Sequence, residues 1–278
     1  MFGGLKSGIV AAALAMAVSA SAAEVNRTNL YRGQSVTNGF GEVNRARALA
    51  PSLEDVLVKV SGDPRLIGDP RVAEMARHAP DYLKAFSYRD LLNNRPPHDE
   101  QGTYDRPQYL TADFDPDKIN ALLASLGRKP WPLPRPKIVA LIEAAPMKGD
   151  SFMLANKSDN HLAADMRAAL LAAAEQTGMP LQLPARYKAD AIRTEKSKPE
   201  VLAKRAKTLG GDLLLVGTMV WREEALGWVA DWHLVSKSQD RHWQLRGFGF
   251  DDTFRNALRG AAQILSGNGQ PEAVVTAK

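Results

Sequence analysis

The sequence predicts an α+β protein of two domains, the second of which is a mixed sheet with helices packed on it. Three observations lead to this prediction. Apolar runs with strand spacing alternate with amphipathic stretches in both halves of the chain. Four prolines within residues 130–136 favour an extended linker between the halves. The chain has 278 residues, 45% of them hydrophobic, which is enough for two ordinary cores.

Residues 1–23 have the order of features found in a secretory signal peptide. Lys6 precedes an uncharged apolar run from Gly8 to Val18, and Ala20 and Ala22 supply the small-x-small pattern that precedes cleavage. The run is too short to span a bilayer, and no later run is long enough. We therefore expect a periplasmic mature protein without a transmembrane segment.

The first domain is expected over residues 24–129, in the order strand, helices, strand, strand, helix. The tetrapeptide Gly-Asp-Pro-Arg occurs twice, starting at Gly62 and at Gly68. In each copy we expect the aspartate to cap a short helical turn that begins at proline. The other expected elements are a strand over 29–38, a helix from Ala46 to Gly62 with a kink at Pro51, strands over 82–89 and 108–114, and a helix from Asp115 to Gly127.

The second domain is expected over residues 137–266, after the linker at 130–136. Its predicted order is strand, helix, strand, helix, three strands, helix, which implies a mixed sheet. Asp159 or Asn160 is expected to cap its first helix, and Asp251 or Asp252 its last. Residues 267–278 lack a periodic apolar pattern and are expected to form a flexible tail.

Two motifs carry a resemblance to a known family. They are the stretch from Arg45 to Arg65, which includes Leu-Glu-Asp-Val-Leu-Val-Lys-Val-Ser-Gly-Asp-Pro-Arg, and Leu-Gly-Gly-Asp at 209–212 followed by Val216-Gly217. The chain resembles the bacterial exported family known as domain of unknown function 2066. This resemblance implies a location in the bacterial envelope and supplies no catalytic residue. In element order the second half is similar to the amino-terminal domain of Tol translocation protein B and to lipoprotein activators of penicillin-binding proteins, which implies an interaction module.

Motifs that would define an enzyme class are missing from the sequence. It has no cysteine, which excludes disulfides, thiolate metal sites and cysteine nucleophiles. None of the five histidines forms the helical pair typical of zinc hydrolases. We therefore assign no catalytic residue, resident metal or cofactor.

One polar cluster offers an alternative to this assignment. Asp231 and His233 lie two residues apart on an expected strand, and a hairpin through Lys237 and Ser238 would bring His242 alongside. Such a cluster would suit a metal or an acid/base pair. The ordinary explanation is a polar, solvent-facing side of the sheet.

Charge is concentrated in one segment. The chain carries a formal charge of +5, and between residues 185 and 208 eight cations face three acids. We expect a binding surface there for an anionic lipid, an acidic glycan or an acidic protein. Nucleic acid is not expected, because Tyr187 alone accompanies the cations and base stacking needs more aromatic residues. The residues predicted to bind are Arg193, Lys196, Lys198, Lys204, Arg205 and Lys207.

Together these features predict an exported protein that acts by binding, as an accessory or assembly factor in the bacterial envelope. Its partner would be an envelope protein or an anionic surface. The alternatives are an envelope hydrolase that uses Asp231, His233 and His242, and a binder of anionic lipid or glycan.

Overall fold

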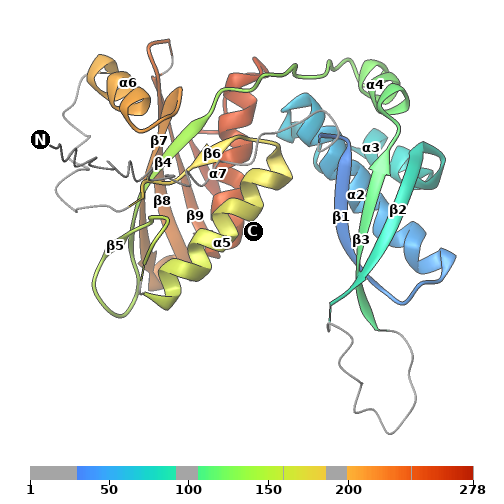
Figure 1. The fold of residues 1–278 in the computed structure, drawn as a ribbon, viewed down its shortest axis with the longest axis horizontal. Coiled ribbons are helices and arrows are strands. Elements are labelled where there is room, and N and C mark those ends of the chain that lie inside the picture. The colour runs from blue at the N-terminus through green and yellow to red at the C-terminus, as the bar shows by residue number, and fades with distance from the viewer. Residues whose placement is uncertain (1–29, 92–105, 159, 186–198, 239, 278) are drawn as a thin grey trace, which may run out of the picture.

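The computed structural model describes residues 30–91, 106–158, 160–185, 199–238 and 240–277. The predicted signal peptide lies outside these residues. Two α+β units stand side by side (Figure 1), and each has its own hydrophobic core. We call them the N-terminal unit (30–127) and the C-terminal unit (137–277). The predicted α+β class is confirmed. No helix in the described ranges is long and apolar enough to cross a membrane.

The N-terminal unit is a three-stranded antiparallel sheet with helices on one face. The strand order is β1-β3-β2, so β3 is central. Along β3, residues 108, 110, 112 and 114 are buried and alternate with partly exposed residues on the other face. The elements of this unit are β1 (Arg32–Asn38), α2 (Glu42–Ser61), η1 (Pro64–Leu66), α3 (Pro70–Ala76), η2 (Ala79–Tyr82), β2 (Leu83–Asp90), β3 (Pro107–Phe114) and α4 (Pro116–Ser125).

Helix α2 supplies more residues to the core of this unit than any other element. Leu49, Leu53 and Leu57 lie on one face of the helix and are fully buried. The helix continues through Pro51 and ends at Gly62, whose φ of 71° lets its N–H donate to the carbonyl of Val58 at 2.8 Å. This stop is the one that the sequence predicts.

The C-terminal unit is built on a seven-stranded mixed sheet. Its path is β10-β9-β8-β7-β4-β5, and β6 also pairs with β4. Strand β4 runs parallel to β7 and β6, whereas β7, β8 and β9 pair antiparallel. Its elements are β4 (Ile138–Ala145), β5 (Phe152–Met153), α5 (His161–Thr177), β6 (Leu181–Gln182), α6 (Pro199–Thr208), β7 (Leu213–Arg222), η5 (Glu223–Ala225), β8 (Gly227–Val235), β9 (Asp240–Phe248), α7 (Phe250–Leu265) and β10 (Val274–Thr276).

Helices cover the two faces of this sheet unequally. Helices α5 and α7 cover one face, and α6 packs on the other (Figure 1). Alternate residues of β8, including Trp232 and Leu234, point to the α5 and α7 side and are buried. On the α6 side the core is small and is centred on β4 and β7, so the outer part formed by β8 and β9 stays partly open to solvent.

The proline-rich segment at 130–136 does more than connect the units. Arg135 is buried and donates to the carbonyls of Lys59 at 2.7 Å, Thr177 at 3.1 Å and Gly178 at 3.0 Å. The guanidinium therefore lies between the C-terminal ends of α2 and α5, where helix dipoles favour a cation. The same guanidinium stacks on the ring of Trp131, with its central carbon 4.2 Å from the ring centroid.

Two predicted details of the C-terminal unit are wrong. The N-cap of α7 is Gly249, and Asp251 and Asp252 lie in the first turn of that helix, where their charge still suits the dipole. The expected flexible tail contains β10, which runs parallel to β9. Backbone pairing with a free strand edge needs no apolar periodicity in the added strand, so the sequence pattern did not indicate it.

Candidate functional site

The β8–β9 hairpin brings together the histidines that the sequence singles out. His233 on β8 lies directly opposite His242 on β9. Asp240 begins β9 two residues before His242, so the carboxylate and the imidazole share one face of the strand. We call Asp240, His233 and His242 the His–Asp cluster. It lies on the open side of the sheet, opposite α5 and α7.

The three side chains are in direct contact. The two imidazole rings stack with centroids 3.8 Å apart and planes 16° apart. The Nε2 atom of His233 lies 2.8 Å from Oδ1 of Asp240, and the Nε2 atom of His242 lies 3.4 Å from the same oxygen. Both ring nitrogens therefore face one carboxylate oxygen.

The surroundings of His233 disfavour its protonated, positively charged form. Burial lowers the pKa of His233, and the adjacent His242 lowers it further, against the opposing effect of Asp240. The hydrogen bond with His233 lowers the pKa of Asp240. At neutral pH the arrangement therefore favours an ionised carboxylate beside a neutral His233 ring.

Asp231 is not a member of this cluster. It lies opposite Gln244, whose amide donates to its carboxylate at 2.9 Å. The predicted pairing of His233 with His242 is confirmed, but the carboxylate beside the two rings is that of Asp240 and not, as predicted, that of Asp231. The missed signal was the Asp-x-His spacing at the start of β9, which is the same two-residue period that linked Asp231 to His233.

The predicted basic surface is described only in part. Arg193, Lys196 and Lys198 lie outside the described residues. On α6, Lys204 is exposed, while Lys207 forms an ion pair with Asp212 at 2.6 Å. Arg205, the remaining predicted cation, also lies on this helix and is partly exposed.

A group of aromatic and arginine side chains lies in the N-terminal unit where the turn after β1, the start of α2 and strand β2 meet. Tyr88 contacts Phe40 and Phe86 edge to face, with ring centroids 5.1 and 5.7 Å apart. The guanidinium of Arg45 lies 4.7 Å above the ring of Phe86. Phe40 is 61% exposed and Phe86 44% exposed. We call Phe40, Arg45, Phe86 and Tyr88 the aromatic–arginine patch, a group that the sequence analysis did not find.

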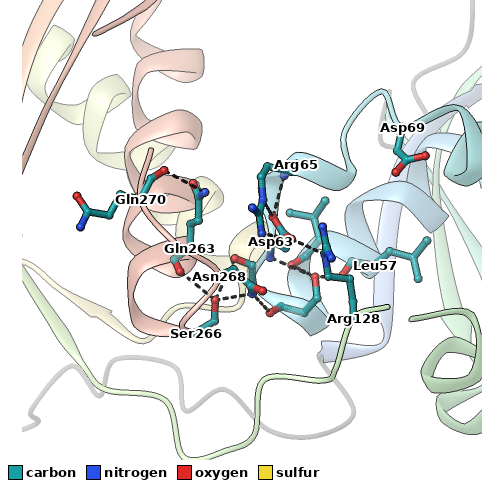
Figure 2. A network of polar contacts seen from close by, with 12 residues as sticks. Leu57, Asp63, Arg65, Asp69, Arg128, Gln263, Ser266, Asn268 and Gln270 are labelled. Carbon is teal, nitrogen blue, oxygen red and sulfur yellow. Dashed lines mark hydrogen bonds and ion pairs between the residues drawn. The ribbon is translucent and has the colours of Figure 1, made fainter. Parts of the chain in front are cut away.

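The first Gly-Asp-Pro-Arg copy forms a buried polar network (Figure 2). The carboxylate of Asp63 is fully buried and caps η1 by accepting from the N–H of Arg65. It also accepts from the Arg65 side chain at 2.8 and 2.9 Å, and Arg128 lies 2.6 Å away. The predicted caps at Asp63 and Asp69 are both confirmed.

This network continues into the C-terminal unit. The amide of Asn268 donates to the carbonyl of Ser61 at 2.9 Å, and the hydroxyl of Ser266 donates to that of Gly62 at 3.2 Å (Figure 2). The most distinctive motif of the sequence thus joins the end of α2 to the end of α7. Its role is structural.

A polar cavity of about 390 Å³ lies where β1, α2 and α5 meet. Arg32 and Asp113 form an ion pair at its wall, and Glu175 lines it from α5. Lys59, which is almost fully buried, donates to the carbonyl of Arg32 at 2.7 Å. Burial lowers the pKa of Lys59 to about 8.

Comparison with known proteins adds one match. Residues 22–132 match a family described as a domain of unknown function (DUF8605). The match includes both Gly-Asp-Pro-Arg copies and stops within the proline-rich segment. It is a different family from domain of unknown function 2066, and the resemblance to the latter stays a prediction. No curated protein matches the chain.

Proposed function

We propose that this protein acts by binding, as an exported accessory factor of the bacterial envelope, and that the aromatic–arginine patch receives a protein partner. The observation that supports this most is the composition of the patch. Aromatic residues and arginine are the types enriched in the cores of protein interfaces. Here Phe40 and Phe86 are exposed and pack on the partly buried Arg45 and Tyr88, near the start of α2, which points away from the C-terminal unit (Figure 1).

The neighbourhood of the patch fits the same use. Val43 is 64% exposed in the first turn of α2, and Val36 is 56% exposed on β1. Val36 lies on the other face of the sheet, opposite Tyr109, on whose ring Arg89 stacks at 4.6 Å. Exposed apolar and aromatic side chains gathered at one end of a unit mark an interaction site more often than a solvated surface. The exposed Arg47 and Arg89 favour a partner with an acidic rim around an apolar centre.

The patch is tested by site-specific photocrosslinking in cells. A photoreactive residue at position 40 should capture one envelope protein, and the same residue at Leu171, which is 45% exposed on α5, should not. Phe86→Ser should abolish capture from position 40, whereas Val274→Ser, at an exposed residue of β10, should leave it unchanged. Equal products from positions 40 and 171, or none from either, would count against the proposal.

Export is tested separately. Cell fractionation should place the processed chain in the periplasm.

The anionic-surface alternative is tested with lipid vesicles. Binding to anionic vesicles should weaken steeply with salt and with Lys204→Gln. Salt-independent binding, or none, argues against that alternative.

A further inference from the structure

We propose that the His–Asp cluster is a binding site for a divalent transition metal ion, with Zn²⁺ as the ion that its ligands suit best. The Nε2 atoms of His233 and His242 and one carboxylate oxygen of Asp240 would be the ligands. All three atoms lie within 4.8 Å of one another.

The distances match a tetrahedral metal site. With metal–ligand bonds of about 2.0 to 2.2 Å, neighbouring ligand atoms of a tetrahedral zinc site are about 3.3 Å apart. The two separations between imidazole nitrogen and carboxylate oxygen are 2.8 and 3.4 Å. Because the two rings are stacked with their planes 16° apart, the imidazoles must rotate out of the stack before both nitrogen lone pairs can point to one ion.

The chemistry of the donors also suits a metal. Two imidazoles and a carboxylate are a ligand set that zinc uses in proteins. Both imidazole nitrogens lie beside the same carboxylate oxygen, so the three donor atoms are already gathered in one place.

The strands hold the donors in place before a metal arrives. His233 and His242 are paired in register across two hydrogen-bonded strands, and Trp232 and Trp243 alternate with them and pack into the core on the other face. The side chain of His233 is 18% exposed, so its rotamers are restricted. Three protein ligands leave one tetrahedral position for water or for a ligand from a partner.

The test is zinc binding to the untagged mature chain after chelator treatment. Isothermal titration calorimetry should show one Zn²⁺ per chain, and Co²⁺ should give the visible absorption of a tetrahedral site. In the double variant His233→Ala/His242→Ala and in Asp240→Asn, binding should weaken by at least about tenfold, the loss already typical of removing an outer partner of a metal ligand.

Two matched controls make the result specific. His161→Ala removes an exposed histidine at the start of α5, and Asp231→Asn changes the next acidic residue on the same sheet face. Both should bind Zn²⁺ like the unmodified chain. Circular dichroism should show that the double variant is folded. No uptake of Zn²⁺ by the unmodified chain, or equal uptake by the folded double variant, overturns the proposal, and neither result bears on the aromatic–arginine patch.

Discussion

Two aspartates in the repeated Gly-Asp-Pro-Arg sequence have the same local role in different surroundings. Asp63 and Asp69 each cap a short helical turn and each bind the arginine two residues later. The side chain of Asp63 is fully buried and also contacts Arg128, whereas that of Asp69 is 15% exposed, and the arginine two residues after each aspartate is more than half exposed. A sequence repeat therefore predicts the caps but cannot say which copy carries a buried charge.

The substitution Asp63→Asn should destabilise the protein strongly. Asparagine caps helices as well as aspartate does, so the exchange removes the charge and keeps the cap. The substitution removes the charge that accepts from Arg65, 54% exposed, and pairs with Arg128, 29% exposed, and a hydrogen bond to a charged group contributes about 1.5 to 3 kcal/mol. Asp69→Asn is the matched control and should remain close to the unmodified protein in urea denaturation at pH 7. Equal effects of the two substitutions would contradict this explanation.

The effect of Asp63→Asn should also depend on pH. Burial alone would raise the pKa of the Asp63 carboxyl, but hydrogen bonds from Arg65 and the charge of Arg128 outweigh burial and lower it. A carboxyl whose pKa is lower in the folded state contributes stability above its unfolded pKa of 3.8, and this stability is lost as the pH falls through the folded pKa. The difference in unfolding free energy between the two proteins should therefore shrink when measured at pH 3. If the difference in unfolding free energy is the same at pH 3 and pH 7, the charge of Asp63 is not what stabilises the fold.

At the scale of single elements, the ends of helices are where sequence and structure agree best. Glycine stops at Gly62 and Gly178 and the cap at Asp115 are all as predicted, because each depends on a few neighbouring residues. The short strands β5 and β10 were missed: β5 has two residues, and its pairing is decided by β4 rather than by its own pattern.

The glycine that ends α2 should be harder to replace than its repeat counterpart. Gly62 and Gly68 have φ values of 71° and 74°, so alanine at either position is strained by about 1 to 2 kcal/mol. A methyl group at Gly62 would also lie 2.7 Å from the side chain of Ser266 on the C-terminal unit, whereas nothing lies within 4 Å at Gly68. Gly62→Ala should therefore lower the free energy of unfolding, measured with denaturant, clearly more than Gly68→Ala does. If both substitutions lower the free energy of unfolding equally, the contact between α2 and the end of α7 contributes little to stability.

At the scale of the whole molecule, the predictable part is the content of each unit, and the unpredicted part is the set of contacts between units. The strand and helix orders follow from local periodicity. The positions of Arg135, Asn268 and Ser266 between the units do not, because each acts on backbone carbonyls that no side-chain pattern marks. Contacts between distant segments also decide the candidate sites, and local patterns do not indicate them. The aromatic–arginine patch joins residues from a turn, a helix and a strand, so only the folded chain assembles it.

The contact made by Arg135 should make the two units unfold together. Its guanidinium donates to carbonyls at the ends of both α2 and α5, and burial lowers its pKa to about 10, so it remains charged at neutral pH. In Arg135→Met these carbonyls lose a shared cation, and the units should unfold in separate steps. Tryptophan fluorescence can detect this, because all five tryptophans lie outside residues 30–127. In urea, the unfolding curves from fluorescence and from far-ultraviolet circular dichroism should coincide for the unmodified protein and separate for the variant.

Arg255→Met is the control, because it removes an ion pair with Asp252 inside α7. Its fluorescence and circular dichroism curves should coincide. Coincident curves for Arg135→Met would show that other contacts suffice to couple the units.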